Sequence, residues 1–451
     1  MIWQVGSSRT YTAPSQVSSL VQNSDTVEID AGVYPSNVCR WLADSLVLRA
    51  VGGFAQLQAN GLTYGDKGIW VVDGSHTTIE WIEFTGAVST SHNGAGIRLE
   101  ASDLTVRHCY FHNNEDGILT GVYPGKVTIE FSEFGYNGYG DGFSHNLYIG
   151  HTDTLLFRFN YSHHCNVGHE LKSRAAVNII YCNRISNEVT GNASREIDLP
   201  NGGLAIISGN IIEQGPNSQN SNIIGYGLEG LSNPGPQEFY LVNNTMINDR
   251  ASGTFVQIQN GTSLYKGRNN IFAGNATLLS GMATTLDTAS DLYSAQVSTF
   301  FFVDPANYDY HLISFSPAID AGVNPGLTNG GIQLFPMQEY VHPADSGLRV
   351  VDVTPDIGAF EYPTTITGAH EIREQQEPRI YQTSQTVRIS ARGSIGRIRI
   401  LDLSGRCCFD RLIGSDEISI STGAIFPGIY LIELENYSGI YFHEKVFISG
   451  L

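Results

Sequence analysis

The sequence of 451 residues is poor in charge, and the charge that it carries is mostly negative. Only 15% of the residues are charged, and 25 lysines and arginines face 44 aspartates and glutamates, which gives a net charge of −19. Because a protein that binds nucleic acid needs a basic surface, we exclude nucleic acid as a partner. An anionic substrate is still allowed, since a local group of cations dominates within about 8 Å at physiological salt.

Long apolar runs are missing as well. No stretch reaches the roughly 18 apolar residues of a membrane-spanning helix, so we expect no membrane span. Residues 1–20 lack the basic start and the apolar core of a signal peptide. Either the protein is cytoplasmic or a leader has been removed from this sequence.

Cysteine is rare: there are six, and none forms a CxxC pair. A disulfide scaffold would need a higher density, and we interpret Cys109, Cys165 and Cys182 as small core residues. Runs of Ala, Leu, Glu and Lys that favour helices are nearly absent, whereas the 49 glycines and short bursts of Val, Ile, Thr, Tyr and Phe are typical of many strands and turns.

Internal repeats organise most of the chain. Apolar residues recur about 21 to 29 residues apart, each starting a short alternating strand that leads into a turn, a second strand and an Asn- or His-rich corner. The recurring positions are Ile97, Ile118, Leu147, Leu171 and Ile197, and the corners are Asn114, Asn137, His163 and Asn187. With a period of two, every second side chain points inward, and the pattern predicts a parallel β-solenoid whose corners form side-chain ladders.

These repeats, together with RTYTAPSQVSSLVQNSDTVEIDAGVY (Arg9–Tyr34), DYHLISFSPAIDAG (Asp309–Gly322) and PDIGAFEY (Pro355–Tyr362), resemble the right-handed parallel β-helix of the pectin-lyase-like superfamily. The resemblance covers residues 1–362 and implies an all-β solenoid with an N-terminal cap. We expect a short capping helix at PSQVSSLV, since an uncovered terminal coil is a bare sheet edge. The path of residues 323–354 is left open.

A second domain follows the solenoid. Residues 363–380 are polar and unpatterned, as in a linker, and residues 381–451 alternate like a small antiparallel β-sandwich. The segments ILDLSG, FPGIY and EKVFI of this tail resemble the C-terminal sorting domain of the type IX secretion system. The resemblance implies secretion or cell-surface display and secretion machinery as a partner; an accessory carbohydrate-binding domain is the alternative.

Candidate site residues gather around the stretch GHELKSRA (Gly168–Ala175). In the predicted register Tyr148, Lys172 and Asp198 stack on neighbouring strands and face outward, with Arg98 lower on the same face. Further polar residues are expected on this face or at the starts of its strands: His145, His169, Glu170, Arg174, Arg195, Glu196, Tyr226 and Glu229. Three cations in so acidic a chain point to an anionic substrate.

The chemistry that fits this set is proton abstraction α to a carboxylate in an acidic polysaccharide, by a lyase or an epimerase. The cations Lys172, Arg174 and Arg195 would neutralise the developing charge. Lys172, His169 or His145 would act as the base, and Tyr148 as the acid. We assign Glu170, Arg195, Asp198, Glu196, Tyr226, Glu229 and Arg98 to substrate binding. We expect the protein to act as a monomer.

Other interpretations stay open at this point. A glycoside hydrolase needs two carboxyl groups about 5 to 9.5 Å apart, which Glu170, Glu196, Asp198 and Glu229 can supply. A non-catalytic glycan-binding or adhesive solenoid needs no such pair. The charges can also be an ion-pair ladder on a wet sheet face, worth up to about 1 kcal/mol per pair. We assign no metal ligands, although an acidic solenoid can bind calcium through Asp198, Glu170 or Glu196.

Overall fold

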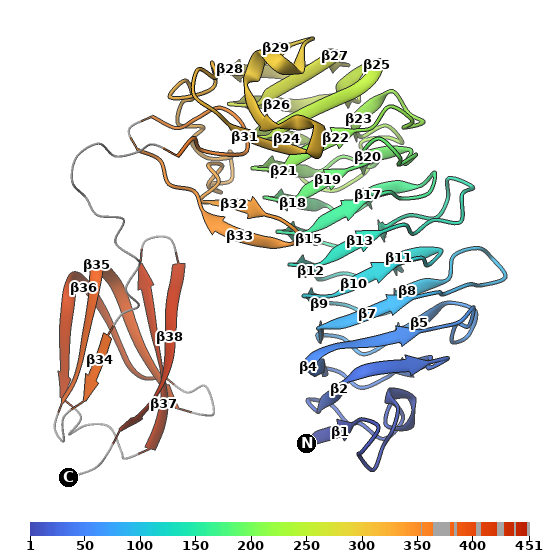
Figure 1. The fold of residues 1–451 in the computed structure, drawn as a ribbon, viewed down its shortest axis with the longest axis vertical. Coiled ribbons are helices and arrows are strands. Elements are labelled where there is room, and N and C mark those ends of the chain that lie inside the picture. The colour runs from blue at the N-terminus through green and yellow to red at the C-terminus, as the bar shows by residue number, and fades with distance from the viewer. Residues whose placement is uncertain are drawn as a thin grey trace. The chain divides into compact units, whose positions relative to one another are not determined.

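The computed structural model describes residues 1–352, 354–363, 379–382, 386–402, 407–421, 428–436 and 439–448. They belong to two compact units, Met1–Pro363 and Thr364–Leu451. In the first unit, the 29 strands from β1 (Ile2–Val5) to β29 (Leu292–Ser294) form one sheet wound into stacked coils (Figure 1). The predicted parallel β-helix is therefore confirmed.

A typical coil contributes three strands, and each strand pairs in parallel with its equivalent in the next coil. The first sheet contains β5 (Gly68–Val72), β8 (Ala95–Leu99), β11 (Asp116–Thr120), β14 (Leu147–Ile149), β17 (His169–Ser173), β20 (Arg195–Leu199) and β23 (Asn222–Tyr226). The second contains β6 (Thr77–Glu80), β9 (Leu104–Arg107), β12 (Lys126–Glu130), β15 (Thr154–Arg158), β18 (Val177–Tyr181), β21 (Leu204–Ser208) and β24 (Glu238–Val242). The third contains β7 (Ile82–Thr85), β10 (Tyr110–His112), β13 (Glu133–Gly135), β16 (Tyr161–His163), β19 (Arg184–Ser186) and β22 (Ile211–Gln214).

The core lies inside the coils, where equivalent apolar side chains stack. Leu147, Leu171 and Ile197 of the first sheet are fully buried, as their period-two pattern predicts. On the third sheet the rings of Phe84, Phe111 and Phe134 stack with centroid separations of 4.9 and 4.7 Å. Because each coil repeats the same inward positions, the outward positions also align into columns.

The N-terminal cap is not the helix that we expected at residues 14–21. Only Pro14–Gln16 is helical, as a short 3-10 turn. Eight residues are too few to hold an α-helix without strong tertiary contacts, and here Val17 leaves the turn to bury its side chain against the first coil. In the described part of the chain, no helix is long and apolar enough to cross a membrane.

Two ladders of asparagine side chains satisfy backbone groups at the corners. The predicted ladder is seen at Asn114 and Asn137, whose amides bond one another at 3.1 Å, and it continues to Asn146. His163 does not join it and contacts Glu133 at 3.2 Å. A longer ladder, not predicted, runs through Asn160, Asn183, Asn210, Asn244 and Asn270 to Asp291.

The segment of residues 323–349 runs over the outer face of the second sheet at strands β18 and β21. The Ser208 hydroxyl donates to the carbonyl of Leu334 at 2.9 Å, and the Tyr181 hydroxyl accepts the Met337 amide at 2.8 Å. The hairpin of β32 (Gln338–Val341) and β33 (Asp345–Leu348) belongs to the same segment. The segment therefore covers the outer face of the second sheet at Tyr181 and Ser208. These contacts do not involve the outer face of the first sheet.

The second unit is antiparallel, as predicted. It contains β34 (Arg379–Gln382), β35 (Thr386–Asp402), β36 (Cys407–Ser421), β37 (Gly428–Asn436) and β38 (Gly439–Ile448) in one five-stranded sheet, with β35 pairing to three of the others. Most of the predicted linker at 363–380 lies outside the described residues, as do parts of the ILDLSG and FPGIY segments.

Candidate active site

The candidate site lies on the outer face of the first sheet. The register places Tyr148 beside Lys172 and Lys172 beside Asp198 on the neighbouring strands β14, β17 and β20. Below Tyr148 the column continues to Leu119 and Arg98. We call Tyr148, Lys172, Arg174, Arg195, Asp198 and Glu229 the outer cluster. It brings together a phenol, three cations and two carboxylates.

Asp198 is the fixed centre of the outer cluster. Its side chain is only 4% exposed and forms ion pairs with Arg195 and, at 3.4 Å, with the Lys172 ammonium. The His169 Nε2 atom lies 3.7 Å from Oδ2 of Asp198. Arg195 is anchored a second time, because its Nη2 donates to Oδ1 of Asn222 at 3.0 Å. Asp198 therefore sets the positions of two cations and a histidine.

Glu229 closes the other side of the cluster from the loop that follows β23. Its carboxylate accepts Lys172 at 3.2 Å and Arg174 at 2.7 Å. Arg174 also donates from Nε to the Tyr148 hydroxyl at 2.7 Å and from Nη1 to Asn201 at 2.6 Å. Burial disfavours the charged carboxylate, but the hydrogen bonds from Arg174 and Lys172 outweigh it and hold the pKa of Glu229 below its ordinary value.

Two histidines lie where strands β14 and β17 begin. The main-chain N–H of His169 donates to Nδ1 of His145 at 3.0 Å, so the proton of a neutral His145 sits on Nε2. Burial, and then the neighbouring imidazole and Lys172, lower the pKa of His145 well below its ordinary value. Burial, Arg195 and Lys172 do the same to the pKa of His169. Both imidazoles are therefore neutral at neutral pH.

Glu170 and Glu196 do not face outward, and this part of the prediction is wrong. Both are fully buried at the corner where the chain enters the first sheet. The Glu170 carboxyl receives the Cys165 amide at 2.9 Å and contacts the Ser162 hydroxyl at 2.9 Å, so local hydrogen-bond donors hold it inside the coil. Burial raises the pKa of Glu170 to about 8 and raises that of Glu196 well above its ordinary value. Neither carboxyl reaches a polymer on the surface.

Tyr226 is also misplaced by the prediction. Its register partner is Leu199, an inward position, and its hydroxyl donates to the carbonyl of Gly203 at 2.5 Å inside the core. The outward position beside Asp198 belongs to Gly225. A Cβ atom at Gly225 would lie 2.8 Å from Nη1 of Arg195, so the missing side chain leaves room for the Arg195–Asp198 pair. In the sequence, the glycine directly before Tyr226 could have indicated that the outward position belongs to residue 225 and that Tyr226 points inward.

Arg98 belongs to a separate group lower on the same face. Its Nε donates to Glu100 at 2.8 Å, and Lys67 contacts the same carboxylate at 2.9 Å. Tyr123 donates its hydroxyl to Glu100 at 3.3 Å. We call Lys67, Arg98, Glu100 and Tyr123 the lower cluster. Leu119 separates Arg98 from Tyr148 in the column, so the structure does not bring Arg98 into the outer cluster.

Calcium does not fit the carboxylates that we considered for it. Asp198 faces Arg195, Lys172 and His169, and a divalent cation there would meet like charge. The other two candidates, Glu170 and Glu196, are buried and favour the protonated form. Among the residues that the structure describes, no group of three or more His, Cys, Asp or Glu is arranged to hold a metal ion.

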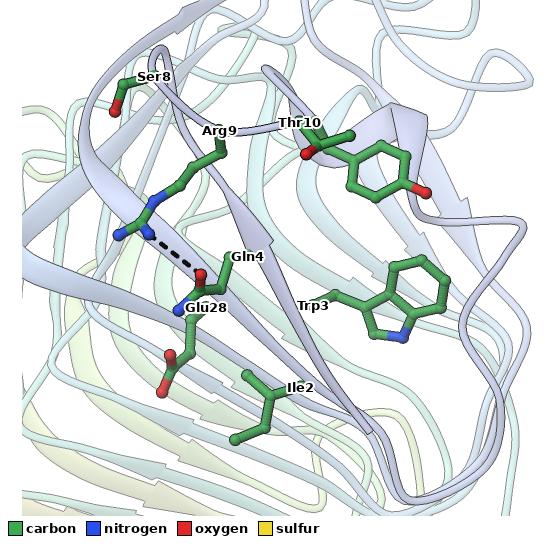
Figure 2. A pocket seen from close by; sticks show the side chains of 8 residues that line it. Ile2, Trp3, Gln4, Ser8, Arg9, Thr10 and Glu28 are labelled. Carbon is green, nitrogen blue, oxygen red and sulfur yellow. Dashed lines mark hydrogen bonds between the residues drawn. The ribbon is translucent and has the colours of Figure 1, made fainter.

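Two hollows lie away from these residues. One, of about 530 Å³ at the N-terminal coils, is lined by Trp3, Gln4, Arg9 and Glu28, and Figure 2 shows Arg9 donating to Gln4 within it. The other, of about 460 Å³, lies on the lower second sheet near Arg107. Neither contains a residue of the outer cluster. The outer cluster lies on the outer face of a long parallel sheet, with Glu229 as its most exposed side chain.

Comparisons with known proteins agree with this architecture. Residues 47–212 match a protein family described as "Right handed beta helix region". The crystal structure of pectate lyase Pel9A superposes with a TM-score of 0.54 at 15% identity, over 80% of this chain and 96% of that one. A pectin methylesterase from Aspergillus niger aligns with a TM-score of 0.31 at 10% identity, over 70% of this chain and 91% of that one. Among curated proteins no match was found. The solenoid is therefore a right-handed parallel β-helix; at these identities the likeness concerns the fold.

Proposed function

We propose that this β-helix protein acts on an acidic polysaccharide and cleaves it by β-elimination. The observation that carries the proposal is the outer cluster. In a chain with a net charge of −19, Lys172, Arg174 and Arg195 gather on the outer face of one sheet beside a phenol. Its fold is also that of pectate lyase Pel9A, whose name describes such an activity.

The reaction has to remove a weakly acidic proton next to a uronate carboxylate. Arg174 and Lys172 would bind that carboxylate and stabilise the negative charge that develops on it. Lys172 would first release its own proton to solvent, then take the substrate proton and so become an ammonium again beside the developing charge, while the Tyr148 hydroxyl beside Arg174 would protonate the departing glycosidic oxygen. If the proton were instead returned to the same carbon from the opposite side of the sugar ring, the site would act as an epimerase.

His169 is the second candidate for the base. Its imidazole is neutral, and its side chain is only 10% exposed at the edge of the outer cluster. His145 is a weaker candidate, because its Nδ1 already accepts the main-chain N–H of His169. We therefore assign His145 to positioning His169. A base with a lowered pKa keeps its activity to lower pH than a lysine, so the pH profile of kcat/KM separates the two.

A hydrolase is the second candidate function, and one observation favours it. Asp198 and Glu229 both contact the Lys172 ammonium, at 3.4 and 3.2 Å. The shared ammonium limits the separation of these two oxygens to at most about 6.6 Å, below the upper limit of about 9.5 Å that glycosidases use. The buried Glu170 and Glu196 no longer support this function.

The test is a screen of alginate, pectate and glycosaminoglycans. A lyase produces an unsaturated sugar, and absorbance in the ultraviolet rises. New reducing ends without this absorbance would favour the hydrolase. Binding without either product would leave a glycan-binding or adhesive protein and overturn the proposed lyase.

We also propose that the tail directs secretion or cell-surface display through the type IX machinery. Its motif segments support this, and it forms a compact unit separate from the solenoid. Expression in a bacterium with that machinery, with and without residues 381–451, tests the proposal. Equal export of both forms would contradict it.

A further inference from the structure

We propose that the Glu229 carboxylate occupies the place of a substrate carboxylate and has to be displaced when the substrate binds. The inference rests on the proposed function, since it concerns the same outer cluster. It makes Glu229 a residue that selects acidic over neutral polymers.

The contacts of Glu229 are those of a bound anion. One of its oxygens accepts the Lys172 ammonium at 3.2 Å and the other accepts the Arg174 guanidinium at 2.7 Å. The two cations come from adjacent outward positions of one strand end, whereas Glu229 comes from a loop after β23. A uronate lying on the sheet would meet the same donors in the same way.

The exposure of the three side chains shows which partner can leave. Glu229 is 48% exposed, while Lys172 is 12% and Arg174 is 17% exposed. The main chain of Glu229 is held by a hydrogen bond from its N–H to the carbonyl of Pro200 at 2.9 Å. Release therefore needs only a rotation of the Glu229 side chain into solvent, with the loop backbone in place.

The lower cluster contains a carboxylate that is not free to leave its two cations. Glu100 also lies between two cations, Lys67 and Arg98, but it is 14% exposed and accepts a third bond from Tyr123. Asp198 is more buried still. Of these three carboxylates, Glu229 is the most open to water, at 48% exposed, and it contacts the two cations from the solvent side.

Such an arrangement discriminates between ligands. An acidic sugar replaces one carboxylate by another, so Lys172 and Arg174 stay paired. A neutral sugar that pushed Glu229 aside would take the carboxylate from Arg174 and leave Lys172 with Asp198 alone, and it would bind weakly. Competition by Glu229 also weakens the acidic ligand, because part of its binding free energy is used for displacement.

The experiment compares Glu229→Gln with the wild-type full chain. We measure calorimetric binding of an oligogalacturonate, of an oligoalginate and of acetate, and KM on any polysaccharide that the protein cleaves. We expect the variant to bind the acidic probes about ten-fold more tightly and to show a lower KM. Glu28→Gln, which removes the same charge from an ion pair with Arg49 near the N-terminus, is the control and should not change binding.

Unchanged or weaker binding of all three probes by Glu229→Gln would overturn the inference. A gain shared by Glu28→Gln would also overturn it, because net charge alone would explain the effect. Failure of the proposed function is a different result: no polysaccharide is cleaved by either form, yet the binding gain of Glu229→Gln remains.

Discussion

Strands β17 and β20 carry ionisable side chains on their outer and inner sides. The outer side chains form ion pairs, whereas the inner ones are buried carboxyls. On the outer side Lys172 and Asp198 form an ion pair that shares its cation with a half-exposed glutamate. On the inner side Glu170 and Glu196 are fully buried, and burial, followed by the neighbouring Glu213, raises both pKa values. Similar residues thus form ion pairs on the outer side and buried, hydrogen-bonded carboxyls on the inner side.

The inner side extends beyond these two carboxyls. Glu213 on β22, in the same coil as Glu196, is buried beside Ser186, which donates to it at 2.7 Å, and burial raises the pKa of Glu213 to about 7. We call Glu170, Glu196 and Glu213 the inner acids. At neutral pH Glu170 is mostly protonated and Glu213 about half protonated, which reduces the cost of an unpaired buried charge.

The largest expected effect is the loss of activity when Lys172 is removed. Lys172→Ala should lower kcat/KM on the cleaved polysaccharide by about a thousand-fold, because base catalysis and charge neutralisation are lost together. The midpoint of thermal unfolding should also fall, because Asp198 is only 4% exposed and would keep Arg195 but lose Lys172, so kcat/KM is compared at a temperature where both forms are folded. Lys126→Ala on the second sheet is the control and should keep full activity. A fully active Lys172→Ala variant would remove the proposed site and would leave His169 as the base to test.

Next in size is the cost of removing an inner acid. Glu170→Ala should lower the free energy of unfolding by about 3 kcal/mol, because it leaves a cavity and orphans the hydrogen-bond donors of Cys165 and Ser162. Chemical denaturation of the full chain measures the change. On the outer side, Glu229→Ala should change it by less than about 0.5 kcal/mol. If both variants lost the same free energy of unfolding, the inner carboxyl would contribute no more to stability than the outer one.

The pH dependence of stability sharpens the same contrast. The folded state binds the protons of Glu170 and Glu213 more tightly than the unfolded state does, with pKa values of about 8 and 7 against 4.5. Stability from these groups is therefore full below about pH 4.5 and is lost as the pH rises to about 8, by up to about 1.4 kcal/mol per pH unit for each group.

The two site histidines act in the opposite direction. Their lowered pKa values mean that the unfolded state binds protons more tightly, so stability falls when the pH drops below about 6.5. Thermal unfolding between pH 4.5 and pH 9 should show a flatter alkaline limb in Glu170→Gln than in the wild type. An identical limb would mean that Glu170 is not protonated in the fold.

Much of this architecture could be predicted from the sequence, because every coil of a solenoid repeats the same order of inward and outward residues. The spacing from Leu147 to Leu171 and Ile197 aligns the coils, and this alignment alone stacks Tyr148, Lys172 and Asp198. The ion pairs of the cluster follow from that stacking and from side-chain length.

The failures lie where the repeat is interrupted. Alternation holds along a strand but not at the corner, so nothing in the local pattern showed that donors from Ser162 and Cys165 would turn Glu170 inward. Tyr226 follows a longer loop, and the phase was misjudged by one residue, which exchanges the inner and outer faces. The sorting-domain assignment of the tail stays a prediction.

The smallest expected effect concerns the edge of the outer cluster. The Tyr148 hydroxyl accepts Arg174 at 2.7 Å, and Tyr148→Phe removes this acceptor together with the proposed acid. If the phenol protonates the leaving oxygen, kcat should fall by about ten-fold with little change in KM, since the cations that bind the substrate remain. The loss of one hydrogen bond should cost about 1 kcal/mol of stability. A change confined to KM would instead make Tyr148 a positioning residue for Arg174, and the outer side would then lack its acid.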